Sequence, residues 1–195
     1  DYYIRTEKEK ILIDVFLEGE SLDGYYVRVS AAGALQKKIA NRKLSFVLKI
    51  ENALKWNAEN PSLYNVKLEL FKEEKVVECH SKKIGFVNYR ISDNKMLVNN
   101  TPITIKGINR HEHDVKNGRA ISVELIEKEL TLIKEYNMNA VRTAHYPQHP
   151  AFYEIASELG IYVMDEADIE THGCSSMGDQ GWLSKRPEWL DAYID

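Results

Sequence analysis

Three polar clusters stand out in the sequence: Asn109-Arg110-His111-Glu112-His113, Arg142-Thr143-Ala144-His145-Tyr146-Pro147 and Asp165-Glu166-Ala167-Asp168-Ile169-Glu170-Thr171-His172-Gly173. Each cluster directly follows a short run of the type found in β-strands, at residues 103–108, 140–141 and 161–164. Parallel α/β folds keep their chemistry at the carboxyl ends of their strands. We therefore expect the clusters to lie at three strand ends.

The segments between the clusters have the pattern of helices. Ser122 is a suitable N-cap, and residues 126, 130 and 133 place apolar side chains on one helical face. Pro150 suits a first helical position and Gly160 the position just past a helix end. The order strand, helix, strand, helix, strand predicts the opening of a parallel sheet or barrel.

The first 87 residues show a different pattern. Short β-type runs, several of them alternating, occupy residues 11–17, 25–29, 44–50, 66–71 and 76–79. They predict a small antiparallel sandwich. We interpret Trp56, in the loop before Tyr64, as a core residue rather than a ligand contact.

A hairpin should join the two parts of the chain. Residues 96–98 and 102–105 flank a turn at Asn99-Asn100. We place the domain boundary near residue 88, which gives a sandwich at 1–88 and a barrel-type domain at 89–195. A third helix should begin at Pro187.

Composition narrows the classes of partner. The 195 residues carry a net charge of −4 without a basic cluster, which argues against nucleic acid. No apolar run approaches the roughly 20 residues that span a bilayer, so no membrane partner is expected. The two cysteines, Cys79 and Cys174, fall in different predicted domains, and free thiols are the simplest interpretation.

The residues of the clusters leave their roles open. Arg142 lies in an otherwise apolar strand and needs a carboxylate partner, which no nearby residue obviously supplies. If the third cluster is extended, Glu166, Asp168, Glu170 and His172 share one side. Glu170 and His172 would then form half of a site for Mg²⁺ or Mn²⁺, or belong to a solvated acidic loop.

The three clusters, in this order, resemble the start of the catalytic barrel of glycoside hydrolase family 2, most closely its β-galactosidases. The similarity extends upstream, since Trp56 to Tyr64 and Gly85-Phe86 resemble the family's immunoglobulin-like sandwich. The resemblance implies a sandwich followed by the first three βα units of an incomplete (β/α)8 TIM barrel. It also implies a terminal β-D-galactoside as substrate, in a parent protein that can form a homo-oligomer.

The resemblance also implies roles for individual residues. His111 and His145 would bind the sugar, and Arg142 would orient the nucleophilic carboxylate. Glu170 and His172 would bind Mg²⁺, with a third protein ligand outside this chain. Asp168 departs from the Asn usual in the family, which adds a negative charge beside the metal loop.

Family members use two glutamates in a retaining mechanism. The acid/base follows an Asn at the fourth barrel strand and the nucleophile comes later, so we expect an inactive fragment that lacks both. Glu166 belongs to the third strand's motif and is a poor stand-in for the acid. The alternatives are a family 2 β-glucuronidase or β-mannosidase fragment, and a non-catalytic carbohydrate-binding module. An Asn-Glu pair about 20 residues after Asp195 would favour an enzyme over a binding module.

Overall fold

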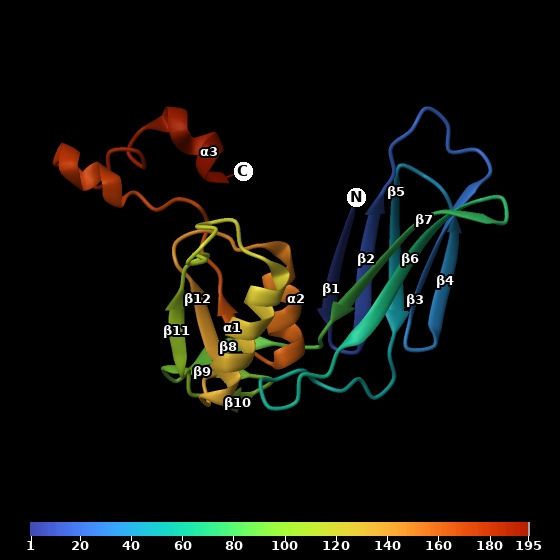
Figure 1. The fold of residues 1–195 in the computed structure, drawn as a ribbon. Helices are drawn as coiled ribbons and strands as arrows, with labels where there is room; N and C mark the ends of the chain where they lie inside the picture. Colours follow the sequence, from blue (N-terminus) through green and yellow to red (C-terminus); the bar gives the residue numbers. More distant parts are fainter. Residues whose placement is uncertain (195) are drawn as a thin grey trace. The chain divides into compact units, whose positions relative to one another are not determined.

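The computed structural model describes residues 1–194, which group into two compact units (Figure 1). The first unit contains residues 1–104 together with Ser157–Gly160, and the second contains residues 105–156 and those from Ile161 onward. Among the described residues, no helix has the length and apolar character that a membrane crossing needs.

The first unit is built on two antiparallel sheets. One has the order β1-β2-β5, with β1 at Tyr2–Glu7, β2 at Lys10–Phe16 and β5 at Lys43–Lys49. The other has the order β4-β3-β6-β7, with β3 at Tyr25–Ala31, β4 at Ala34–Ile39, β6 at Tyr64–Lys72 and β7 at Lys75–Ile84. The five strands expected from the sequence are present, and β1 and β4 are additional. Both additional strands lie at sheet edges and bury no residue fully, which explains their weak sequence signal.

Alternation along the strands builds the core of the sandwich. Ile11, Ile13 and Val15 on β2 are buried, as are Leu44, Phe46 and Leu48 on β5. Val27, Val29 and Val66 from the other sheet belong to the same apolar cluster. Since side chains alternate between the faces of a strand, every second residue of these strands enters the core.

Glu69 is a buried charge in this unit. Arg28 Nε lies 2.8 Å from Glu69 Oε2, and Lys67 Nζ lies 2.7 Å from Oε1. The hydrogen bond from Arg28, followed by that from Lys67, lowers the pKa of Glu69 to about 2, against the opposing effect of burial. Glu69 therefore remains ionised although its side chain is almost inaccessible.

Trp56 is buried, which confirms its interpretation as a core residue. Its indole Nε1 donates to the carbonyl of Ser157 at 2.8 Å, and its own carbonyl accepts from Asn99 Nδ2 at 2.9 Å. A Cβ on Gly85 would lie 2.7 Å from the Trp56 Cβ, so the backbone at Gly85 approaches the indole too closely for any side chain.

A small sheet of order β10-β9-β8 follows, with β8 at Tyr89–Ser92, β9 at Lys95–Val98 and β10 at Thr101–Pro102. The predicted hairpin is confirmed, because Thr101 pairs with Val98 across the turn. Asn99 and Asn100 have φ values of 51° and 68°, the left-handed pair that a tight two-residue turn requires.

The second unit contains a parallel sheet of order β11-β12-β13. Its strands are β11 at Gly107–Arg110, β12 at Ala140–Thr143 and β13 at Tyr162–Met164, with helices α1 at Val123–Glu135 and α2 at Pro150–Leu159 between them. The predicted strand order is confirmed. The first strand, expected at 103–108, instead begins at Gly107, because pairing with β12 starts at Ala140 opposite that residue.

The predicted features of both helices are confirmed. Ser122 Oγ accepts from the backbone N–H of Leu125 at 3.2 Å, as an N-cap should. Ile126, Leu130 and Ile133 form the buried face of α1, and Gly160 follows α2 with a φ of 72°. Pro150 is the first residue of α2.

The third cluster is not an extended strand, so the condition under which Glu166, Asp168, Glu170 and His172 would share one side is not met. Pairing between β13 and β12 ends at Met164 opposite Arg142, so the next residues lack a neighbouring strand to hold them extended. They form a loop that leads into the 3-10 helix η1 at His172–Met177. Further on, η2 at Pro187–Trp189 and α3 at Leu190–Ile194 begin at the predicted Pro187.

Candidate functional site

The three parallel strands end at Arg110, Thr143 and Met164. Because their carboxyl ends meet at one edge of the sheet, the residues that follow are brought together. The register Asn109↔Arg142↔Met164 places one residue of each strand in a row just before that edge.

An open pocket of about 680 Å³ lies at this edge. It is lined by His111, Glu112, His113, Arg119, His145, Tyr146, Asp168 and Glu170. The rings of His111 and His145 meet edge to face, with centroids 5.6 Å apart. The structure thus brings together His111, His145 and Glu170 from three separate clusters, whereas Arg142 and His172 are not among the lining residues.

Arg142 has the carboxylate partner that its place in an otherwise apolar strand requires, and this partner is Glu166. Its Nε donates to Glu166 Oε1, while Nη1 lies 3.4 Å from Asn109 Oδ1. The other oxygen of Glu166 lies 2.9 Å from His145 Nδ1. The partner comes from the next strand end, a proximity that sequence separation alone does not reveal.

Glu166 is ionised in this arrangement. Burial acts to raise its pKa, but the hydrogen bonds from His145 and Arg142 outweigh it and lower the pKa below the ordinary value. The bridging carboxylate therefore carries a negative charge between an imidazole and a guanidinium group.

A second set of hydrogen bonds fixes the backbone at Glu166. Its N–H donates to Thr143 Oγ1 at 2.9 Å, and the same hydroxyl donates to Asp165 Oδ1 at 3.0 Å. Tyr153 on α2 also donates to Asp165, at 2.7 Å. Thr143 is fully buried, and this network joins the ends of β12 and β13.

Arg110 has no role assigned from the sequence, yet its side chain is buried. Its Nε and Nη2 lie 3.0 and 2.8 Å from Glu129 Oε2 on α1, and its Nη1 donates to Gln148. Glu112 in turn accepts from the backbone N–H of His149 at 2.8 Å. The hydrogen bonds of Arg110 and Glu112 to Gln148 and His149 connect the loop that carries His111 with the loop that carries His145.

Glu170 and His172 provide an incomplete set of metal ligands. His172 Nδ1 lies 3.8 Å from Glu170 Oε1, and the imidazole side chain is 84% exposed. A carboxylate oxygen and an imidazole are ligand types that suit a hard divalent cation. Within residues 1–194, however, no three His, Cys, Asp or Glu side chains gather in the way a metal ion requires.

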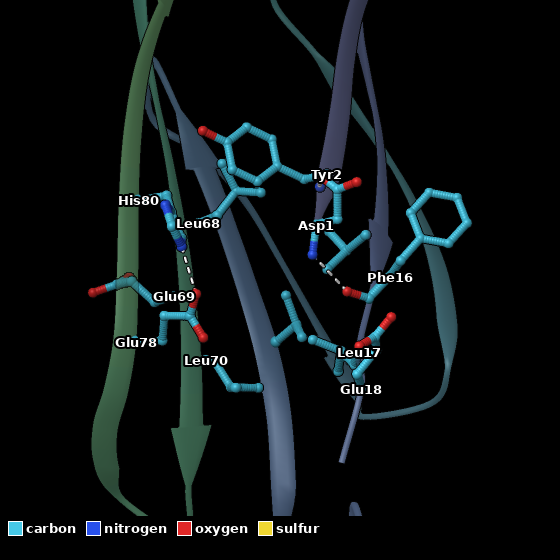
Figure 2. A pocket seen from close by; sticks show the side chains of 12 residues that line it. Asp1, Tyr2, Phe16, Leu17, Glu18, Leu68, Glu69, Leu70, Glu78 and His80 are labelled. Carbon is cyan, nitrogen blue, oxygen red and sulfur yellow. Dashed lines mark hydrogen bonds and ion pairs between the residues drawn. The ribbon is translucent and has the colours of Figure 1, made fainter. Parts of the chain in front are cut away.

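A separate pocket of about 370 Å³ opens in the sandwich unit, between Tyr2 and Phe16 on one side and Leu68 and His80 on the other (Figure 2). Two of its acidic groups, Glu69 and Glu78, already have partners. Glu78 Oε1 lies 2.6 Å from His80 Nε2, and Glu69 is bound by Arg28 and Lys67. The pocket at the strand ends is therefore the better candidate for a functional site.

The comparisons with known proteins agree with this fold. The family model for the TIM barrel domain of glycosyl hydrolases family 2 matches residues 89–195, and a second model of the same family matches residues 5–86. The chain belongs to glycosyl hydrolases family 2, with the family's sandwich domain followed by the start of its TIM barrel domain.

Its relatives point to one branch of that family. A β-galactosidase of Pseudoalteromonas haloplanktis is 44% identical over 74% of this chain and 14% of the relative. A β-galactosidase of Streptococcus thermophilus is 36% identical over 100% of this chain and 20% of the relative. The chain thus spans a fifth or less of the length of these relatives.

Solved structures share the fold. A β-glucuronidase of Bifidobacterium dentium, complexed with coumarin-3-O-glucuronide, superposes with a TM-score of 0.76 at 28% identity. It covers 86% of this chain, which covers 30% of that protein. A β-glucuronidase of Dictyoglomus thermophilum gives a TM-score of 0.68 at 25% identity, with 86% and 29% covered.

Proposed function

We propose that this chain is part of a retaining exo-β-galactosidase that releases terminal β-D-galactosyl residues, and that it forms one wall of the sugar site. The observation that carries the proposal is the pocket in which His111, His145 and Glu170 meet from three strand ends. Relatives named β-galactosidase, at 36–44% identity, support the choice of sugar.

His111 and His145 are the proposed sugar-binding residues. Their rings line the pocket and present nitrogen atoms that can exchange hydrogen bonds with hydroxyl groups. Arg142 is the proposed residue that orients the nucleophile. Its Nε is occupied by Glu166, so this role falls to the terminal nitrogens of its guanidinium group.

Glu170 and His172 are the proposed protein ligands of a Mg²⁺ ion, with Mn²⁺ as the alternative. Water or residues outside this chain would complete the coordination. A bound divalent cation would supply positive charge that can stabilise the negative charge developing on the leaving-group oxygen, whereas the sugar ring itself becomes positively charged.

Both catalytic carboxylates are proposed to lie outside residues 1–195. The family resemblance places the acid/base in an Asn-Glu pair, and the sequence contains no such pair. We expect residues 1–195 to give no turnover of a chromogenic β-galactoside, measured by release of the chromophore at high protein concentration. Steady turnover that survives repurification and is abolished by Glu166→Gln would contradict the placement.

Sugar binding by the chain tests the pocket directly. A non-hydrolysable β-thiogalactoside should shift the side-chain NMR signals of His111 and His145, and His145→Ala should weaken its binding about tenfold, because one hydrogen bond is lost. His80→Ala is the matched control, since His80 lies in the sandwich pocket, and it should bind like the parent.

The same titration distinguishes a β-galactosidase from the second candidate function, a β-glucuronidase. Similarity to the β-glucuronidase structures favours a glucuronide-specific parent as the alternative. A β-thioglucuronide that shifts the same imidazole signals, where the thiogalactoside does not, would replace our proposal with this one. Absence of shifts with either sugar would contradict a sugar site in this pocket.

A further inference from the structure

We propose that Glu166 is a positioning residue that fixes the tautomer of His145, with the ring proton on Nδ1 and the lone pair of Nε2 left to accept a hydrogen bond. The assignment follows from the bridge that Glu166 makes between His145 and Arg142. It goes beyond the family roles given above, in which Glu166 has none.

The contact between His145 and Glu166 determines the donor. His145 Nδ1 lies 2.9 Å from Glu166 Oε2, within hydrogen-bond distance. An ionised carboxylate only accepts hydrogen bonds. The proton of the neutral imidazole must therefore be on Nδ1, which leaves Nε2 as an acceptor.

Arg142 competes for the same nitrogen. Its Nη2 lies 3.2 Å from His145 Nδ1, and a guanidinium group can only donate. If Arg142 donated to Nδ1, the ring proton would have to move to Nε2. Glu166 prevents this, because it binds Arg142 Nε with one oxygen and His145 Nδ1 with the other. Removal of the carboxylate should thus reverse the tautomer rather than merely release it.

Glu166 is itself held in place. Its backbone N–H donates to the fully buried Thr143 Oγ1, and that hydroxyl donates to Asp165. A carboxylate that orients an imidazole in this way resembles the outer partners that fix histidine orientation in metal sites. These hydrogen bonds hold the backbone from which the Glu166 carboxylate reaches the imidazole ring.

The tautomer determines whether His145 Nε2 donates or accepts a hydrogen bond when a ligand binds. His145 lines the pocket, and within residues 1–194 its Nε2 has no hydrogen-bond partner. A neutral His145 would accept from a ligand hydroxyl group rather than donate to it. That the ligand is a sugar rests on the proposed function, whereas the tautomer does not.

Nitrogen-15 NMR reads the tautomer directly, because protonated and unprotonated ring nitrogens have well-separated chemical shifts. In the 195-residue chain at about pH 8, where imidazole is ordinarily neutral, His145 should show a protonated Nδ1. In Glu166→Met, which removes both oxygens at similar side-chain length, Arg142 should become the donor and the proton should appear on Nε2.

Asp168→Asn is the matched control. It removes one negative charge from the same loop, and Asp168 has no hydrogen bond to His145, so the proton should stay on Nδ1. If Glu166→Met does not fold, Glu166→Asp, which withdraws the carboxylate by one methylene, should still lose part of the Nδ1–H population.

The wild-type spectrum alone can overturn the proposal, if His145 carries its proton on Nε2. A Glu166→Met spectrum that matches the wild type would do the same. Neither of these two NMR measurements requires a sugar. Failure of the thiogalactoside to bind therefore removes the proposed function and leaves the tautomer assignment standing, and the reverse also holds.

Discussion

Gly160→Ala should destabilise the first compact unit by about 3 kcal/mol. Gly160 has a φ of +72°, where a residue with a Cβ costs about 1–2 kcal/mol more than glycine. The added Cβ would also lie 2.4 Å from the carbonyl oxygen of Ala58, a backbone atom that cannot turn away. Forced repacking of this kind typically costs a further 1–3 kcal/mol. Urea unfolding of the chain measures the sum.

Gly33→Ala separates the two effects. Gly33 has a φ of +82°, but nothing lies within 4 Å of the position that its Cβ would take. It should therefore cost only about 1–2 kcal/mol, from the left-handed backbone alone. Equal losses for the two variants would contradict the close approach of Ala58 to Gly160.

Arg110→Met should destabilise the second unit by about 3 kcal/mol. The Arg110 side chain is 5% exposed and binds Glu129, with Gln148 as a further acceptor. Removal of one member of a buried ion pair costs about 3–5 kcal/mol, because the remaining charge is left without its partner. Glu129 is 35% exposed and can regain some hydration, so the lower end of that range is expected.

Arg5→Met is the control for the loss of an arginine ion pair. Arg5 binds Asp14 at 2.8 Å, but its side chain is 61% exposed. Exposed pairs contribute about 0–1 kcal/mol. Denaturant unfolding followed separately in each unit compares the two variants, and a loss below about 1 kcal/mol for Arg110→Met would show that the buried network is dispensable.

Local signals in the sequence were sufficient for most of the fold. The Ser122 cap, the apolar face of α1, the Asn99-Asn100 turn and the alternation of β2 each depend on neighbours close in sequence. Such signals can be recognised in a single sequence because the side chains of helices and strands repeat with a fixed period. The edge strands β1 and β4 were missed since their burial is shallow.

The candidate site was less accessible to the same reasoning. The strand-end clusters were found because they interrupt apolar runs, and His111, His145 and Glu170 do line one pocket. Partnerships were not found. The pairs Arg142 with Glu166 and Arg110 with Glu129 join residues 24 and 19 positions apart, and only the paired register of the strands and the packing of α1 bring them together. The sequence also left open whether the chain stays extended after Asp165, and it does not, because the pairing of β13 with β12 ends at Met164.

The two cysteines differ in accessibility, with Cys79 exposed on β7 and Cys174 buried in η1. A maleimide dye added to the native chain would consequently attach at a single position, on the sandwich. The fluorescence of a dye on Cys79 would then report the thermal unfolding of the sandwich unit, without any cysteine having to be introduced or removed.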